Sequence, residues 1–190
     1  MVAEKIATAL KSRSSRTITG DHFKPAAVLI PIQEKQDGDY LVLTQRADHL
    51  NHHSGQIAFP GGRVDDSDAG EIAAALRESH EEIGIHPSDV RILGKLDQID
   101  AAYGYRVTPI VGVIPAHYEF RLNPAETAAV SAVPIAALLE PANFVVDDYL
   151  SPRGQPSYHF YVNGWDVWGV TARIIVQFLE IVYDFKVQRP

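Results

Sequence analysis

The stretch from Phe59 to Ile85 constrains the fold of this chain more than any other. It opens with Pro60-Gly61-Gly62, crosses an acidic loop and continues as a run of helix-forming residues. At about 100° per residue, four side chains of that run fall on one narrow face; they are Ile72, Leu76, Ser79 and Ile83. Such a face packs against a sheet, so we expect a helix that lies on a β-sheet.

A second face of the predicted helix carries only negative charge. Glu71, Glu78 and Glu82 project onto it, and Glu81 lies beside them. A solvated helix face usually mixes both signs, because like charges four residues apart destabilise a helix by roughly 0.2–0.5 kcal/mol per pair. A bound cation would relieve the repulsion, and hard divalent cations take oxygen ligands. We therefore predict that Glu78, Glu81 and Glu82 bind Mg2+, with Mn2+ as the alternative ion.

The ends of this helix carry their own signals. Ser67 or Asp68 can cap its first turn, and Asp68 and Glu71 have the spacing of a capping box. Capping is enough to explain Glu71, which is therefore left out of the predicted metal site. Gly84 is predicted to end the helix in the left-handed conformation.

The carboxylate pattern resembles a known family signature. Arg77-Glu78-x-x-Glu81-Glu82-x-Gly84-Ile85 resembles the Nudix box, the signature of hydrolases that cleave nucleoside diphosphates linked to another moiety. Two features depart from the general pattern: Ser79 replaces an aliphatic residue, and the spacing from Gly62 to Arg77 is one residue longer. Asp68 or Glu71 would then take the place of the early glutamate of the box.

Residues upstream narrow the resemblance. Leu43-Thr44-Gln45-Arg46-Ala47 and the run from His53 to Gly62 are similar to the extra signature of the coenzyme A pyrophosphatase branch, which also tends to carry the longer spacing. Val107-Thr108-Pro109 and the run from Trp168 to Ala172 are similar to that branch as well, so the resemblance spans most of the chain. Asn51 stands where the branch would have a basic residue.

The resemblance implies a fold and an activity. The fold would be of the α/β class, a Nudix-like α/β/α sandwich with a mixed, curved sheet, and the order of elements lacks the regular βαβ alternation of a doubly wound sheet. The activity would be metal-dependent hydrolysis of the diphosphate bond of coenzyme A or acyl-coenzyme A, giving 3′,5′-ADP and 4′-phosphopantetheine or its acyl form. The alternatives are a Nudix hydrolase of ADP-ribose or of a dinucleoside polyphosphate, and a sensor that binds such a ligand without cleaving it.

Further residues are candidates for the reaction. The resemblance to the box implies that Arg77 is an orienting salt-bridge partner. Glu78 or Glu126 is the candidate general base, although Glu126 equally fits the start of a helix. Arg46 is either a salt-bridged strand end or a phosphate clamp, and the resemblance favours the clamp. The remaining expected substrate contacts are His53, Gln56, Gly61 and Gly62. The glycines permit a turn that presents backbone amides to an anion.

The rest of the chain predicts one domain, 25–190, with a helix and connector in 1–24 that pack on it. Val2 to Lys11 is expected to form that helix, and Ser12 to Arg16 a solvated connector. Tyr103 and Tyr105 lie in a loop, where they either stack on a base or pack locally. Strands are expected at 26–32, 40–46, 90–96, 107–114, 118–122 and around 159–162, and further helices at 134–140 and 168–184.

Composition excludes several classes of protein. A formal net charge of −7, from 17 basic and 24 acidic residues, argues against a general nucleic-acid binder. The absence of cysteine excludes disulfides and thiolate metal sites. No apolar run is long enough to span a bilayer and residues 1–20 lack a secretory signal, so the expected location is the cytoplasm. The expected partner is a small nucleotide, and the apolar stripe of the last helix indicates core packing or a homodimer.

Overall fold

A long β-hairpin and a parallel neighbouring strand form the centre of the structure. The computed structural model describes residues 2–20, 22–49, 54–150 and 156–187. Strands β1 (Lys24–Lys35) and β2 (Gly38–Arg46) pair antiparallel, while β7 (Tyr105–Ile114) runs parallel to β1. The strands predicted at 26–32, 40–46 and 107–114 are therefore confirmed, because their apolar runs are buried within this sheet.

Shorter strands extend this mixed sheet on both sides. Strands β3 and β8 pair with β2, β4 pairs with β1, and β5 and β6 pair with β7, all of them antiparallel. Their bounds are β3 (Ile57–Ala58), β4 (Gly61–Arg63), β5 (Arg91–Lys95), β6 (Ile99–Ala101) and β8 (Thr127–Pro134). Since β2 and β4 pair with different parts of β1, the chain after β2 returns to the middle of the sheet.

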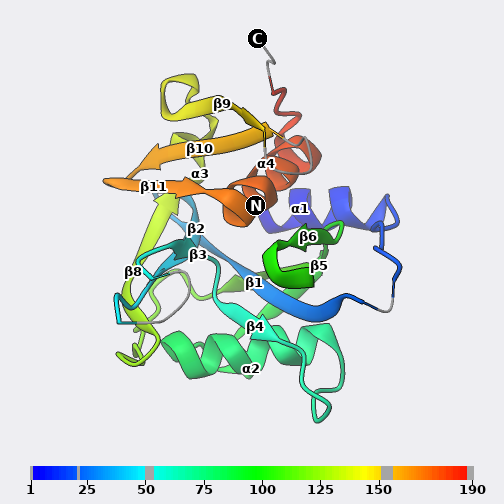
Figure 1. Cartoon of the computed structure of the whole chain (residues 1–190). Helices are drawn as coiled ribbons and strands as arrows, with labels where there is room; N and C mark the ends of the chain where they lie inside the picture. The colour runs from blue at the N-terminus through cyan, green and yellow to red at the C-terminus, as the bar shows by residue number, and fades with distance from the viewer. Residues whose placement is uncertain (1, 21, 50–53, 151–155, 188–190) are drawn as a thin grey trace.

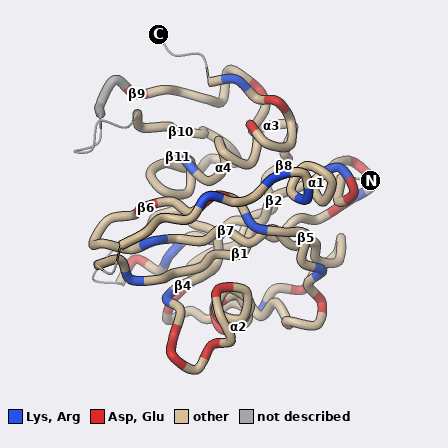
Figure 2. The backbone as a smooth tube through the Cα atoms, turned by 90° about the vertical axis from the view of Figure 1, so that its right-hand side faces the viewer, with Lys and Arg blue, Asp and Glu red and all other residues tan. Residues whose placement is uncertain are grey.

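Helices cover both faces of this sheet (Figures 1 and 2). Helix α2 (Glu71–Ile83) lies on one face, and α1 (Val2–Lys11) and α4 (Gly169–Tyr183) lie on the other. A second sheet of β9 (Phe144–Leu150), β10 (Pro156–Val162) and β11 (Trp165–Trp168) lies beside α4. The short helical segments are α3 (Ile135–Leu139) and the 3-10 turns Pro87–Asp89, Ala102–Gly104 and Pro141–Asn143. A mixed sheet between helices confirms the predicted α/β/α sandwich.

Two apolar clusters hold the layers together. On one face, Ala74, Ala75 and Ile83 of α2 pack against Ala27 and Leu29 of β1. On the other face, α4 buries most of its apolar stripe, namely Ile174, Ile175, Phe178, Leu179 and Val182. Burying one large aliphatic side chain contributes roughly 1.5–3 kcal/mol. The stripe is thus core of a single copy of the chain, and the homodimer stays a prediction.

The sequence prediction was wrong for several elements of the fold. Residues 118–122 form no strand; instead, the Tyr118 hydroxyl accepts a hydrogen bond from the His86 amide at 2.8 Å. Strands β8 and β9 were not predicted, and β8 is rich in small residues that have no strong strand preference. The segment from Ser12 to Arg16 is the largely exposed connector that was predicted, and the structure adds ion pairs from Arg13 and Arg16 to Asp97.

The N-terminal helix contacts the domain directly. Helix α1 packs against β5 and α4, and its Ala3, Ile6 and Leu10 are buried. The division of the chain at residue 24 stays a prediction, although β1 begins at that residue. No helix in the described part of the chain is both long and apolar enough to cross a membrane.

Candidate active site

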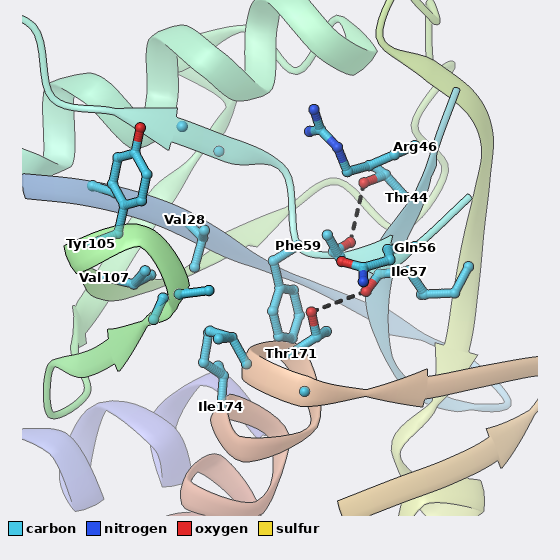
Figure 3. Close-up of a pocket in the computed structure, with 18 of the residues that line it drawn as sticks. Val28, Thr44, Arg46, Gln56, Ile57, Phe59, Tyr105, Val107, Thr171 and Ile174 are labelled. Carbon is cyan, nitrogen blue, oxygen red and sulfur yellow. Dashed lines mark hydrogen bonds between the residues drawn. The ribbon is translucent and has the colours of Figure 1, made fainter. Parts of the chain in front are cut away.

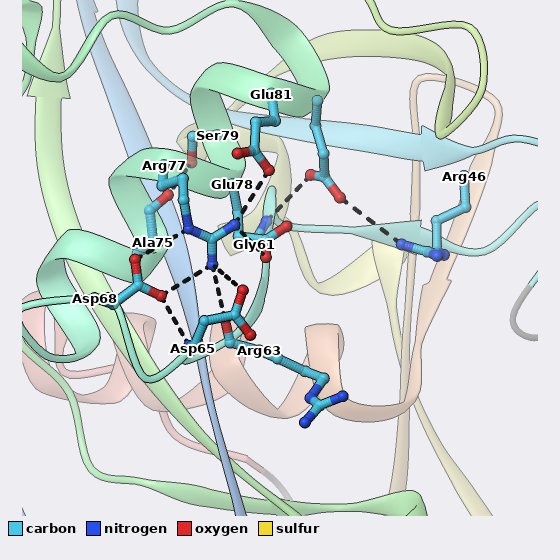
Figure 4. A network of polar contacts seen from close by, with 11 residues as sticks. Arg46, Gly61, Arg63, Asp65, Asp68, Ala75, Arg77, Glu78, Ser79 and Glu81 are labelled. Carbon is cyan, nitrogen blue, oxygen red and sulfur yellow. Dashed lines mark hydrogen bonds and ion pairs between the residues drawn. The ribbon is translucent and has the colours of Figure 1, made fainter.

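Helix α2 places a buried carboxylate beside the edge of the sheet. Glu82 is only 5% exposed, and its Oε2 accepts a hydrogen bond from the Gly61 amide at 3.1 Å. Its Oε1 lies 3.8 Å from Nη1 of Arg46, the last residue of β2 (Figure 4). Three elements therefore meet at one carboxylate.

Burial changes the chemistry of Glu82. Loss of solvent raises the pKa of Glu82 to about 7, the Gly61 amide and Arg46 oppose that rise, and the charges of Glu78 and Glu126 add to it. Burial likewise raises the pKa of Glu78, although its contact with Arg77 acts in the other direction. The site thus concentrates negative charge in a place where solvent does not relieve it.

Arg77 ties this helix to the acidic loop before it. Its Nε and Nη2 each donate to the Asp68 carboxylate at 3.0 Å, and its Nη1 donates to Glu78 at 2.9 Å and to Glu81 at 3.1 Å. Its Nη2 also donates to the Arg63 carbonyl at 3.1 Å. The bond from Arg77 holds the pKa of Asp68 below its usual range. This geometry fits the predicted orienting role of Arg77, since one guanidinium fixes three carboxylates.

The Gly61-Gly62 pair forms strand β4 in place of the predicted turn. Gly61 has φ 151° and lies so close to β1 that a Cβ there would meet the Ala27 carbonyl oxygen at 2.4 Å. A Cβ on Gly62 would lie 2.5 Å from the carboxyl carbon of Glu78. Both glycines permit close approach, and the Gly61 amide is used by Glu82.

A loop after β7 brings Glu126 to the same place. The Asn123 amide donates to the Glu82 carbonyl at 2.9 Å, and the Glu126 carbonyl accepts from the Ala47 amide at 2.9 Å. The charge of Glu126 raises the pKa of both Glu78 and Glu82. Glu126 therefore lies within electrostatic reach of the helix carboxylates, and no helix begins there.

A cavity of about 780 Å³ opens next to Glu82 (Figure 3). Arg46, Gln56, Gly61 and Gly62 line it, together with apolar residues of the sheet and the start of α4. The Thr171 hydroxyl donates to the Ile57 carbonyl at 3.0 Å, which ties α4 to β3 at the wall of the cavity. Its size is in the usual range for a small-molecule site, roughly 300–1,000 Å³.

Two further predictions concern His53 and Glu71. His53 falls outside the described residues. Glu71 does not cap α2, which begins at Glu71 after Gly70 and has no side-chain cap. The Glu71 carboxylate instead accepts a hydrogen bond from Lys95 at 2.9 Å, which lowers the pKa of Glu71. Asp68 is taken by Arg77, so the predicted capping box is wrong. Gly84 ends the helix with φ 75°, as predicted.

The donor set fits a divalent cation. Burial and the charges of neighbouring carboxylates raise the pKa of both Glu78 and Glu82, and a hard cation with oxygen ligands would stabilise their charged forms. Within the described ranges, no three acidic or histidine side chains already converge closely enough to hold an ion. The carboxylate oxygens are therefore suitable ligands for such a cation, while in this structure Glu78 and Glu81 accept hydrogen bonds from Arg77.

Sequence reasoning missed several residues of this site. Lys24 and Arg63 line the cavity, and Asp65 lies 3.6 Å from Arg77. Thr171 also lines the cavity, and it belongs to the run from Trp168 to Ala172. The position of Arg63 directly after Gly61 and Gly62 was the sequence signal for this residue, because the two glycines were already expected to contact the substrate.

Comparison with known proteins identifies related chains. A model of the NUDIX domain matches residues 22–153. The uncharacterised Nudix hydrolase NudL of Escherichia coli strain K12 is 46% identical over 154 residues, covering 80% of this chain and 79% of the relative. The protein of the same description from Shigella boydii serotype 18 has the same identity and coverage.

Solved structures share the fold at lower identity. The MutT/nudix family protein of Enterococcus faecalis has a TM-score of 0.55 at 14% identity and covers 96% of this chain and 74% of its own. The Nudix hydrolase RenU of M. smegmatis has a TM-score of 0.52 at 20% identity and covers 60% of this chain and 73% of its own. At these identities the similarity concerns the sandwich fold alone.

Proposed function

The chain belongs to the Nudix family, and from this premise we propose that it hydrolyses the diphosphate bond of coenzyme A or acyl-coenzyme A. Family membership makes it a hydrolase of a nucleoside diphosphate derivative. One observation supports the narrower substrate: the motifs that resemble the coenzyme A branch line the same cavity as Glu82. Thr44 and Arg46 come from the first motif, and Gln56 to Phe59, Gly61 and Gly62 from the second.

The proposed reaction consumes one water molecule. Its oxygen adds to a phosphorus of the diphosphate, and the bond from that phosphorus to the bridging oxygen breaks. The leaving phosphate keeps the electron pair of that bond, and a carboxylate accepts the proton of the water. The products are 3′,5′-ADP and 4′-phosphopantetheine or its acyl form. Glu78 and Glu126 are the candidate proton acceptors, since both lie within electrostatic reach of Glu82.

Arg46 is suited to hold the diphosphate beside these carboxylates. Its Nε is buried without a hydrogen-bond partner in the described part of the chain, and its Nη1 is 3.8 Å from Glu82. A guanidinium binds phosphate oxygens through parallel hydrogen bonds. A substrate phosphate would therefore provide the partners that the protein itself does not.

Glu78, Glu81 and Glu82 would hold Mg2+ or Mn2+. When bound, such a cation neutralises charge on the diphosphate and stabilises the charge that develops as the bond breaks. Arg77 keeps Glu78 and Glu81 on the site side of α2, and the Gly61 amide fixes Glu82.

Product analysis on a panel of substrates tests the proposal. The purified protein is incubated with coenzyme A, ADP-ribose and a dinucleoside polyphosphate, with and without Mg2+, and the products are separated by chromatography. We expect 3′,5′-ADP from coenzyme A, only when the cation is present. Faster turnover of ADP-ribose or of the dinucleoside polyphosphate would overturn the coenzyme A assignment. Turnover of none of them would favour a sensor.

A matched pair of variants tests the carboxylates. Glu82→Gln removes a charge at the site, whereas Glu180→Gln removes one from the exposed face of α4. We expect the first variant to lose activity by roughly a factor of a hundred or more, as for loss of a principal electrostatic group, and the second to retain it. Equal activity of the two would contradict the site. The cytoplasmic location stays a prediction from the sequence.

A further inference from the structure

The cavity has a second cationic end that the reaction above does not use. Lys24 and Arg63 both line it and are exposed. Among the residues that the structure describes, neither forms an ion pair with an acidic side chain. Figure 4 shows the Arg63 side chain extending away from the Arg77 network, which uses only the Arg63 carbonyl.

Strand register places these two cations on one face of the sheet. Arg63 of β4 pairs directly with Ala26 of β1, and Lys24 precedes Ala26 by two residues on the same strand. Directly paired residues and residues two apart project to the same side, close enough for long side chains to meet one ligand. Lys24 also pairs with Tyr105 of β7, so all these side chains line the floor of the cavity.

This cationic end is separate from Arg46. The Lys24 ammonium lies 5.7 Å from the centre of the Tyr105 ring. In Figure 3, Tyr105 and Arg46 lie on opposite sides of the cavity, with Val28 and Phe59 between them. Apolar residues therefore lie between Arg46 and the end of the cavity at Tyr105, where Lys24 lies.

Tyrosines accompany the second end. Tyr103 lines the cavity, is 68% exposed and has a positive φ of 59°. A bulky residue in this conformation is uncommon, and here it places an exposed ring at the edge of the site. A nucleoside bound at this end would lie beside Tyr103 and Tyr105, whose rings are of the kind that stack on a base.

We propose that Lys24 and Arg63 bind a second phosphate group of the substrate, the 3′-phosphate on the ribose of coenzyme A. The inference rests on the proposed function and specifies how the nucleotide half of the substrate is bound. An arginine fork and a lysine point charge together suit a phosphate monoester. In a chain with net charge −7, unneutralised cations inside a substrate cavity supply the local field that an anionic ligand needs.

Turnover of coenzyme A and 3′-dephospho-coenzyme A tests this directly, because the two differ only in that phosphate. We expect Lys24→Met and Arg63→Met each to lower kcat/KM for coenzyme A by roughly three- to tenfold, and that for the dephospho compound by less than about twofold. Arg91→Met is the matched control, since Arg91 is exposed at the start of β5 and lies outside the cavity lining. It should change neither value.

Binding measured by calorimetry separates this inference from the proposed function. The wild-type protein should bind 3′,5′-ADP more tightly than 5′-AMP, and both methionine variants should lose that preference. Equal binding of the two nucleotides to wild type, or no binding of either, would overturn the 3′-phosphate site. Failure to cleave coenzyme A together with a preference for 3′,5′-ADP would overturn the proposed reaction and leave the phosphate site supported.

Discussion

The Oε2 atom of Glu82 lies 3.1 Å from the backbone nitrogen of Gly61, so the helix carboxylate is fixed by the strand that precedes it. Gly61 itself packs closely against β1, since a side chain at this position would collide with Ala27 and Val28. The position of the Glu82 carboxylate therefore depends on the backbone of Gly61. A substitution at residue 61 tests that dependence.

Gly61→Ala should displace β4 and, with it, the amide that holds Glu82. An added Cβ would lie 2.4 Å from the Ala27 carbonyl oxygen, so we expect the free energy of unfolding to fall by roughly 1–3 kcal/mol and activity to fall at least about tenfold. Gly38→Ala is the control, since Gly38 has a similar φ of 143° and no atom near the added Cβ. Activity assays and urea unfolding of both variants measure these changes. Equal losses of activity in the two variants would refute the dependence of Glu82 on Gly61.

Glu82 should make the metal-free protein less stable as the pH rises. Its folded pKa of about 7 exceeds the ordinary 4.5, so its contribution is fully present below about pH 4.5 and is lost as the pH rises to about 7, by roughly 3 kcal/mol. Urea unfolding in the presence of a chelator, at pH 5 and pH 8, measures this for wild type and Glu82→Gln. The variant should lose less stability between these pH values. Parallel losses would show that Glu82 is not the group responsible.

Arg77 should not be replaceable by lysine. Its guanidinium contacts Asp68, Glu78 and Glu81 at the same time, and a lysine ammonium cannot reproduce that planar set of bonds. Arg77→Lys should lower kcat by roughly tenfold or more and destabilise the protein by roughly 1–3 kcal/mol. Arg91→Lys, on an exposed strand end, should alter neither quantity. Full activity of Arg77→Lys in steady-state assays would contradict the orienting role.

Local patterns predicted the helix of the site, and distant pairings were beyond them. The apolar spacing of Ile72 to Ile83 and the end at Gly84 are properties of a few neighbouring residues, and the structure bears them out. Glu71 was misinterpreted because the local pattern offered a cap, whereas its partner Lys95 comes from strand β5. A residue's partner across the sheet depends on strand order, which no short window of sequence contains.

The same limit applies to the substrate cavity. Arg46 was recognised because it stands in a motif, while Lys24 and Arg63 meet only through the pairing of β1 with β4. Strand β8 was missed because its small residues form a strand only by pairing with β2. The helix and its carboxylate face were therefore readable from the sequence, and the shape of the cavity was not.

Asp97 should fix the N-terminal segment to the domain in a pH-dependent way. Burial would raise the pKa of Asp97, but the Arg16 amide and the guanidinium groups of Arg13 and Arg16 together lower it. The stabilisation is therefore present above about pH 4 and is lost as the pH falls through the lowered value. Asp97→Asn should be less stable than wild type by roughly 1–3 kcal/mol at pH 7, and the gap should narrow at pH 3. A gap that is constant with pH in urea unfolding would contradict this account.

Thr171 should control the cavity without taking part in the chemistry. Its hydroxyl donates to the Ile57 carbonyl at 3.0 Å, joining α4 to β3 where both line the cavity. Thr171→Val keeps the shape but leaves that carbonyl without its donor, so KM should rise by roughly three- to tenfold. Because Thr171 makes no hydrogen bond to the carboxylates of α2, kcat should be nearly unchanged. Thr171→Ser restores the hydroxyl and should recover KM; a serine variant as impaired as the valine variant would show that the methyl group matters in place of the hydrogen bond.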